Sequence, residues 1–162
     1  VTHHCGSCTA CLDICPTKAF VKPNVLNAKR CISYLTIELR ESIPEEFRNA
    51  MGNRVFGCDD CQLVCPWNKF TNESTEDDFK PRHSFDDVEL STLFAWSEEE
   101  FLTNTAGSPI RRIGYECWQR NLAIGLGNAE TSDEVMVALQ KGLASPSEMV
   151  KEHVKWALDQ HQ

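Results

Sequence analysis

Apolar residues recur at helical spacing through residues 91–162, and this pattern predicts paired amphipathic helices there. One run consists of Ile110, Ile113, Cys117 and Ile124. Two later runs consist of Val135, Met136 and Leu139, and of Val150, Val154, Ala157 and Leu158. Helix pairs of this length are typical of HEAT-like repeats. We therefore predict a helical, HEAT-like region whose core includes Cys117, Trp118 and Trp156.

Polar residues ahead of these runs predict where the helices begin. Ser97 followed by Glu100 forms a capping-box pattern. Ser108-Pro109 places a capping hydroxyl before a proline at the first helical position, and Gly127-Asn128 predicts the end of that helix. The starts of the last two helices are predicted at two further pairs, Thr131 with Glu134 and Ser145-Pro146 with Glu148.

Cysteines and charge divide the rest of the chain. Residues 1–70 hold eight of the nine cysteines, with eight Lys or Arg against seven Asp or Glu. Residues 71–90 are polar and acidic, which predicts a connector. Residues 71–105 carry two basic and ten acidic residues, so most of the net charge of −8 lies there. Net charge alone therefore neither supports nor excludes binding of nucleic acid by the two ends.

The composition is that of a soluble globular protein, with 41% hydrophobic and 25% charged residues. No apolar run approaches the roughly 20 residues that span a bilayer, and no signal-peptide pattern opens the chain. We therefore expect a cytoplasmic monomer without a membrane partner. Because the chain starts at Val1, only four residues before Cys5, we also expect it to be a fragment of a longer protein.

The first cysteine motif is Cys5-Gly-Ser-Cys8-Thr-Ala-Cys11-Leu-Asp-Ile-Cys15-Pro16. This is the spacing of two-cluster bacterial ferredoxins, in which the fourth cysteine ligates the other [4Fe–4S] cluster. Three thiolates at intervals of three residues can wrap one cluster on a tight loop. The fourth then points toward a second cluster, and the proline turns the chain away.

The second motif, Cys58-Asp-Asp-Cys61-Gln-Leu-Val-Cys65-Pro66, keeps the same ending, but Val55 stands where its first cysteine would be. Cys31 is the other cysteine available in this region. The assignment that respects the crossover gives one cluster the ligands Cys5, Cys8, Cys11 and Cys65. It gives the other cluster the ligands Cys15, Cys31, Cys58 and Cys61.

Two other uses of these cysteines stay open at this point. Four thiolates in a tetrahedral array also suit Zn²⁺. Disulfides would imply an exported protein and would leave one of nine thiols unpaired. The complete four-cysteine run followed by proline favours iron–sulfur clusters over both. The sequence thus predicts an α+β protein with a two-cluster ferredoxin-like domain (1–70), an acidic connector (71–90) and a HEAT-like helical region (91–162).

Four segments carry a more specific signal than the cysteine spacing: Arg30–Leu39, Gly52–Asn68, Gly107–Gly114 and Arg120–Asn128. They resemble epoxyqueuosine reductases, and the resemblance runs over nearly the whole chain. It implies an iron–sulfur oxidoreductase of queuosine biosynthesis and tRNA processing, which reduces epoxyqueuosine to queuosine at the wobble position of tRNA. The resemblance also implies cobalamin and two [4Fe–4S] clusters as cofactors, and an electron donor as a partner.

In this family an amino-terminal domain carries the corrin, and the present sequence starts after that domain would end. We therefore expect the chain alone to be inactive, and we name no catalytic residue in it. The resemblance implies that the second of the two clusters faces the corrin, with Ser33, Cys58 and Asp59 as cofactor-binding residues. Ordinary roles for Ser33 and Asp59 are a helix cap and a turn residue.

The resemblance further implies that the helical region binds the anticodon stem-loop of tRNA. The candidate contacts are Arg40, Arg111, Arg112 and Arg120. A solvated or salt-bridged surface is the ordinary role of such arginines. Two other functions compete with this one, a stand-alone two-cluster ferredoxin and a binding module with structural metal. The helical region argues against the first, because carriers of that kind need little beyond the cluster fold.

Overall fold

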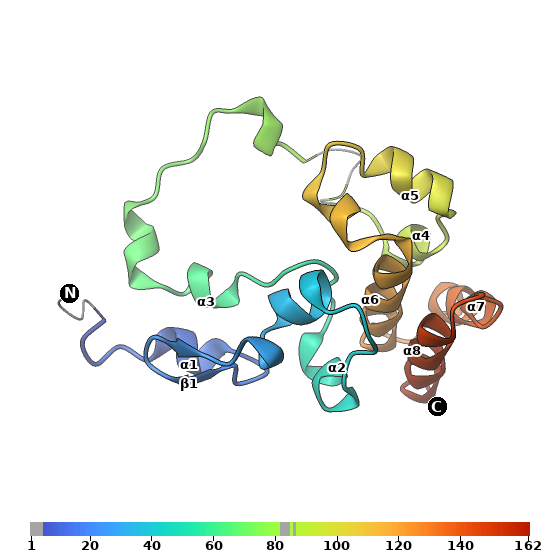
Figure 1. Ribbon diagram of the computed structural model, residues 1–162, viewed down its shortest axis with the longest axis horizontal. Coiled ribbons are helices and arrows are strands. Elements are labelled where there is room, and N and C mark those ends of the chain that lie inside the picture. The colour runs from blue at the N-terminus through green and yellow to red at the C-terminus, as the bar shows by residue number, and fades with distance from the viewer. Residues whose placement is uncertain (1–4, 82–84, 86) are drawn as a thin grey trace.

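The computed structural model describes residues 5–81, 85 and 87–162, and it is mainly helical (Figure 1). The helices are α1 (Ala10–Ile14), α2 (Glu45–Met51), α3 (Asp60–Leu63), α4 (Leu90–Phe94), α5 (Glu98–Asn104), α6 (Tyr115–Gly127), α7 (Asp133–Gly142) and α8 (Glu148–Asp159). Short 3-10 turns are η1 (Ala28–Arg30), η3 (Pro66–Phe70), η4 (Asp77–Phe79) and η5 (Pro109–Ile113), and η2 (Tyr34–Glu38) is a π-helical turn. With the hairpin described next, these elements confirm the predicted α+β class.

A two-stranded antiparallel hairpin lies between Cys15, the last cysteine of the first motif, and Cys31. It consists of β1 (Phe20–Lys22) and β2 (Val25–Leu26), with Phe20 opposite Leu26. The turn between the strands contains Asn24 at φ +61°, a left-handed conformation that asparagine tolerates better than most residues. The hairpin thereby returns the chain from Cys15 to Cys31.

Helix α6 is the centre of the carboxy-terminal half, and it packs closely against α8 (Figure 1). A Cβ placed on Gly127 would lie 2.7 Å from Trp156 and 2.8 Å from the Cα of Ala157, so only glycine allows this approach. Cys117, Trp118 and Trp156 are buried, as predicted. Trp118 also stacks on Trp96 with ring centroids 6.2 Å apart. The helical region is confirmed, while its repeat character stays a prediction.

The hydrophobic core crosses the predicted domain boundary. Buried side chains of the first seventy residues, among them Leu35, Ile43 and Met51, join the same cluster as Leu122 and Val154 of the helical region. The segment from η2 to α2 therefore packs with the helices, although it belongs to the cysteine-rich part by sequence. The division into domains stays a prediction.

The connector follows a different course from the core. The side chains of residues 71–77 and 79–81 are exposed, and that of Phe79 is 78% exposed. Figure 1 shows this stretch as part of a wide arc that leads away from the cysteine-rich part. Among the residues that the structure describes, no helix has the length and apolarity needed to cross a membrane.

The predicted helix ends are partly confirmed. The capping box of Ser97 and Glu100 is present, and Asn128 caps the end of α6. Ser108 also caps as predicted, since its side chain accepts a hydrogen bond from the Ile110 N–H. The prediction that one helix runs from Pro109 to Gly127 is wrong, however. Gly114 at φ +77° breaks it into η5 and α6, because its backbone conformation is not helical.

The predicted starts of the last two helices are misplaced by one and two residues. Ser132 caps α7 through a hydrogen bond from the Val135 N–H, and Ser147 caps α8 through one from the Val150 N–H. The hydroxyl of Thr131 instead pairs with His161 at 2.8 Å. In each case a serine nearer the helix is the N-cap, because its hydroxyl oxygen reaches an unpaired N–H of the first turn.

Candidate iron–sulfur centres

Four cysteines from the two motifs gather around one cavity. Cys5, Cys8, Cys11 and Cys65 line a cavity of about 290 Å³, together with Ala10, Pro66, Trp67, Lys69 and Phe70. This is the set predicted for the first cluster, including the crossover to Cys65. Local structure explains the arrangement: the N–H of Cys8 bonds to the carbonyl of Cys5 at 3.0 Å around Gly6, which has φ +54°. Helix α1 packs against α3, which brings the two motifs together.

The shape of this cavity suits a polyatomic cluster. Its volume is several times the roughly 30 Å³ that one water molecule occupies in the liquid. Within the described residues, no three His, Cys, Asp or Glu side chains lie close enough to share a single metal ion. Thiolates are the ligands of [4Fe–4S] clusters, and Pro66, Trp67 and Phe70 add apolar surface to the same cavity. The donor set therefore fits such a cluster.

The other four cysteines lie on different elements of the same region. Cys15 follows α1, Cys31 lies between η1 and η2, Cys58 directly precedes the cap residue of α3, and Cys61 lies on α3 two residues after that cap. The backbone N–H of Ala19 donates to the Sγ of Cys15 at 3.3 Å, and the hydroxyl of Thr17 lies 3.7 Å from the same sulfur. Hydrogen bonds to ligand sulfurs are one of the means by which proteins set cluster potentials.

The acidities of the thiols reflect this environment. Burial raises the pKa of Cys61, and the neighbouring thiolates of Cys58 and Cys31 raise it further. Burial also raises the pKa of Cys58, an effect that the Asp60 N–H opposes. Burial alone would raise the pKa of Cys15, but the hydrogen bond from Ala19 and those from Thr17 hold it below its ordinary value.

An ion pair accompanies Cys58. Nη2 of Arg54 lies 2.6 Å from Oδ2 of Asp60, and Nη1 of Arg54 donates to the Met51 carbonyl at 3.0 Å. The hydrogen bond to Asp60 raises the pKa of Arg54, and the Cys58 thiolate adds to this effect. Sequence reasoning missed this pair, because no spacing rule links Arg54 to the cysteine motif.

Ser33 and Asp59 both lie close to Cys58. The hydroxyl of Ser33 accepts a hydrogen bond from the Cys58 N–H at 3.0 Å and lies 3.3 Å from the Cys58 carbonyl oxygen. Asp59 directly follows Cys58, is exposed, and accepts a hydrogen bond from the Gln62 side chain at 2.8 Å. Contact of Ser33, Cys58 or Asp59 with a corrin stays a prediction.

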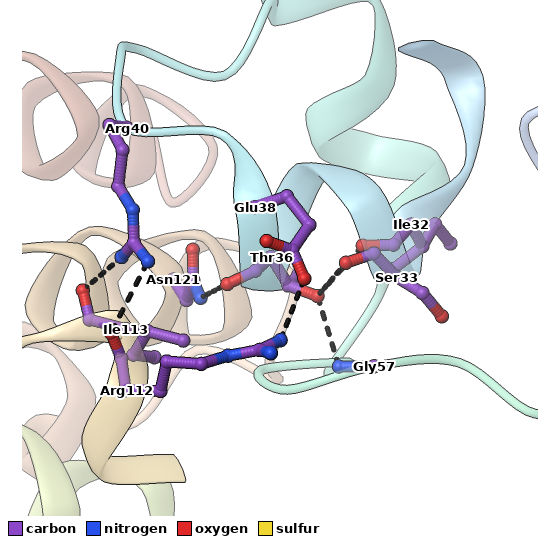
Figure 2. Close-up of polar contacts among 9 residues, drawn as sticks. All are labelled: Ile32, Ser33, Thr36, Glu38, Arg40, Gly57, Arg112, Ile113 and Asn121. Atoms are coloured by element: carbon purple, nitrogen blue, oxygen red, sulfur yellow. Dashed lines mark hydrogen bonds and ion pairs between the residues drawn. The ribbon is translucent and has the colours of Figure 1, made fainter. Parts of the chain in front are cut away.

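Thr36 extends this set of contacts, as Figure 2 shows. Its hydroxyl donates to the Ile32 carbonyl at 2.7 Å and accepts from the Gly57 N–H at 3.0 Å. The Thr36 carbonyl in turn accepts a hydrogen bond from Asn121 of α6 at 2.9 Å. Sequence reasoning missed Thr36 and Asn121, since both read as ordinary helix positions.

The predicted RNA-contacting arginines have four different environments. Arg40 donates to the carbonyl oxygens of Ile113 at 2.5 Å and Arg112 at 3.2 Å, across the two halves of the chain (Figure 2). Arg112 forms an exposed ion pair with Glu38 at 2.6 Å. Arg111 is exposed and lines a surface depression with Glu98 and Glu99. Contact of Arg40, Arg111 and Arg112 with RNA stays a prediction.

The prediction for Arg120 is wrong. Its side chain is fully buried, and it donates to the carbonyl oxygens of Leu35, Leu39 and Glu41 at 2.7–3.0 Å. It also donates to the side chain of Asn121. A guanidinium with every direction occupied by protein acceptors has no donor left for a phosphate. Helical spacing could not reveal this, because Arg120 lies on the face of α6 that packs on η2.

Comparisons with known proteins agree with this geometry. Residues 4–68 match the family described as a 4Fe-4S double cluster binding domain. An epoxyqueuosine reductase of Pseudomonas aeruginosa is 62% identical over 160 residues, and one of Escherichia coli is 52% identical over 160 residues. The resemblance to epoxyqueuosine reductases is confirmed. These alignments cover 99% of this chain but only 44% and 42% of the two reductases, so the chain spans less than half their length.

Solved structures of epoxyqueuosine reductases extend the comparison to the fold. One from Bacillus subtilis is 34% identical, with a TM-score of 0.88, and the match covers 99% of this chain and 43% of that one. Another, described as having a tRNA-Tyr epoxyqueuosine-modified tRNA stem loop, is 30% identical, with a TM-score of 0.74 over 99% of this chain and 51% of that one. The domain match makes residues 4–68 a segment that binds two [4Fe–4S] clusters, which favours iron–sulfur over zinc.

Proposed function

We propose that this chain is the electron-relay and tRNA-docking portion of an epoxyqueuosine reductase, which reduces epoxyqueuosine to queuosine in tRNA. The gathering of Cys5, Cys8, Cys11 and Cys65 around one cavity carries the proposal, because it supports the ligand crossover of a two-cluster relay. The identity to the reductases along the chain supports the substrate class. A tRNA substrate also implies a cytoplasmic protein.

The two sets of cysteines would hold the two clusters, which exchange single electrons when bound. The chain's own contribution is to hold the thiolates in place and to donate an N–H group to a ligand sulfur, as Ala19 does to Cys15. Cobalamin would be bound mainly by the part of the reductase that this chain does not include. Ser33, Cys58 and Asp59 would lie at the boundary with it.

For RNA docking, we propose contacts of Arg40, Arg111 and Arg112 with phosphates of the stem-loop. The neighbouring structure described with a tRNA stem loop supports this part of the proposal. Phosphate contacts of this kind are independent of sequence and weaken with salt. The double substitution Arg111→Ala and Arg112→Ala should therefore weaken tRNA binding by the full-length reductase and reduce the salt slope by about 1–2. Unchanged affinity across a salt series would remove these two arginines from the proposal.

The decisive experiment combines metal analysis with turnover in the full-length reductase. Anaerobically purified protein should contain about eight irons and eight sulfides, and it should reduce epoxyqueuosine in tRNA when supplied with cobalamin and a reductant. Cys65→Ser should lose about half the iron and lower turnover at least about tenfold. Cys117→Ser is the matched control for iron content, since its buried thiol contacts the Leu39 carbonyl and Arg40 rather than a ligand cysteine.

Two outcomes would contradict the proposal in different ways. Stoichiometric zinc without iron in native protein would leave a structural metal site. Iron clusters that transfer electrons to other proteins, without any conversion of epoxyqueuosine, would instead favour a stand-alone electron carrier. The helical region, which packs into one core with η2 and α2, argues against that second candidate.

A further inference from the structure

The chain segment just before Cys58 is held by two hydroxyl groups from one short element. The Gly57 N–H donates to Thr36 Oγ1 at 3.0 Å, and the Cys58 N–H donates to Ser33 Oγ at 3.0 Å. Gly57 has φ +78°, so the chain turns sharply at this point and local periodicity does not fix its path. The direction in which Cys58 leaves the backbone therefore depends on these two hydroxyls.

Both hydroxyls belong to the π-helical turn η2 and the residue that precedes it. This turn begins three residues after Cys31, and it closes through a hydrogen bond from the Leu39 N–H to the Tyr34 carbonyl at 3.0 Å. π-Helical turns are rare in proteins, and those that occur often lie at functional sites. Because Cys31 and Cys58 belong to the same predicted set of ligands, η2 links two ligands of one cluster.

Helix α6 fixes the turn from the opposite side. Nδ2 of Asn121 donates to the Thr36 carbonyl and to the Val55 carbonyl, both at 2.9 Å. Arg120 donates to the Leu35 carbonyl at 3.0 Å, and it also donates to Oδ1 of Asn121, which orients the amide. Asn121 is 1% exposed and Thr36 is fully buried, so water competes for none of these contacts. Asn121 thus bridges the turn that follows Cys31 and the loop that leads to Cys58.

We propose that Thr36, held by Asn121, is a positioning residue that sets the geometry of Cys58 at the cluster of Cys15, Cys31, Cys58 and Cys61, and thereby the reduction potential of that cluster. The inference rests on one part of the proposed function, namely that these four cysteines hold a [4Fe–4S] cluster. Potentials of such clusters respond to hydrogen bonds near the sulfurs and to exposure, and both follow from the path of the backbone at Cys58. Helix α6 would in this way connect the helical region to one redox centre.

The test uses iron-loaded, full-length protein and two substitutions. Thr36→Val removes the hydroxyl at nearly constant volume. Asn121→Asp keeps an acceptor for Arg120 but removes the donor to the Thr36 and Val55 carbonyls. We expect both variants to keep about eight irons and to shift one of the two midpoint potentials in an electron paramagnetic resonance titration. The signal of the same cluster should change shape, and Thr36→Ser should restore both properties.

Matched controls separate positioning from loss of stability. Thr105 is a second fully buried threonine whose hydroxyl bonds to a carbonyl four residues earlier, but it touches no cysteine segment. Asn128, which caps the end of α6, is a second amide that donates to two carbonyls of the first half of the chain, those of Arg48 in α2 and of Gly52 at its end. Thr105→Val and Asn128→Asp should therefore leave both potentials unchanged.

The outcomes distinguish this inference from the proposed function. Wild-type potentials in both Thr36→Val and Asn121→Asp, at full iron content, would overturn the positioning role while leaving the clusters in place. Equal shifts in the control variants would overturn it as well. If Thr36→Val fails to hold iron, the midpoint potentials of Asn121→Asp decide alone: a shift of one potential supports the positioning role, and wild-type potentials overturn it. Absence of iron from the wild-type protein would instead reject the proposed function.

Discussion

Nη2 of Arg120 lies 3.0 Å from the carbonyl oxygen of Leu35, a residue 85 positions earlier in the chain. The bond joins the middle of α6 to the π-helical turn beside Cys31. A basic side chain that sequence alone assigns to the surface is therefore a central buried contact between the two halves.

Arg120→Leu should destabilise the protein by about 3 kcal/mol, because it leaves the carbonyl groups of Leu35, Leu39 and Glu41 without their donor, the first of them buried and the Leu39 contact partly so. Arg120→Lys should recover only part of this loss, since an ammonium group cannot reproduce the planar fork of the guanidinium. Urea unfolding followed by circular dichroism measures both. Arg111→Leu serves as the exposed control and should change stability by less than about 0.5 kcal/mol. Equal effects of the two leucine variants would contradict the structural role.

His153 should make stability depend on pH. Its Nε2 accepts the Ile43 N–H at 3.1 Å and its Nδ1 lies 2.7 Å from the Met149 carbonyl, so the folded protein requires the neutral ring. Burial lowers the pKa of His153 from 6.5 to about 4. The unfolded chain then binds a proton between these values while the folded protein does not, so stability falls as the pH drops from 6.5 toward 4.

The expected loss is about 2 kcal/mol between pH 7 and pH 5, at 1.4 kcal/mol for each pH unit below 6.5. Urea midpoints at the two pH values measure it. His153→Gln should be less stable at pH 7 and should show a smaller difference between the two pH values. A wild-type protein with equal stability at both would show that another group compensates.

The contact of α6 with α8 predicts a strong asymmetry between two glycines. Gly127→Ala should cost about 1–3 kcal/mol, because the new methyl group meets the Ala157 backbone and the Trp156 ring at 2.7–2.8 Å. Gly125→Ala on the same helix meets the Cδ1 end of the Leu90 side chain, which can move. Its cost should therefore be smaller. Thermal unfolding of the two variants side by side gives the comparison, and equal midpoints would argue against the close α6–α8 contact.

The Arg54–Asp60 pair predicts two opposite changes in cluster potential. Arg54→Gln removes a positive charge beside Cys58 and should lower the reduction potential of the neighbouring cluster, because added electron density is then less stabilised. Asp60→Asn removes a negative charge and should raise it. Redox titration of the iron-loaded protein reads the sign directly. Arg111→Gln, at an exposed site beyond the cysteine segments, is the control, and shifts of the same sign in the two test variants would refute the electrostatic explanation.

The sequence predicted the parts of this fold that depend on local rules. The capping box at Ser97 and the glycine-rich end of α6 are such parts, since each involves residues within one turn of each other. The cysteine spacing likewise predicted which four thiols gather around the first cavity. The caps follow from a few neighbouring residues, and the cysteine pattern follows from the ligand crossover known for its spacing, although packing of α1 on α3 brings Cys65 to the first motif.

The features that the sequence did not reveal depend on tertiary contacts. Arg120 reads as a surface residue at helical spacing, and only the packing of α6 on η2 buries it. Thr36 and Asn121 acquire their roles because the chain brings positions 85 residues apart into contact. Gly114 separates η5 from α6 through its own backbone conformation, which apolar periodicity does not record.

The exposed arc of residues 71–81 has one more consequence. Because the buried core already joins η2 and α2 to the carboxy-terminal helices, covalent continuity through the arc contributes mainly by keeping the two pieces at high effective concentration. A chain cut within the arc should accordingly reassemble from its two fragments, and added residues there should cost only about 0.6 kcal/mol for each doubling of loop length. The arc is thus the place where evolution or an engineer can insert a new module without disturbing the redox centre.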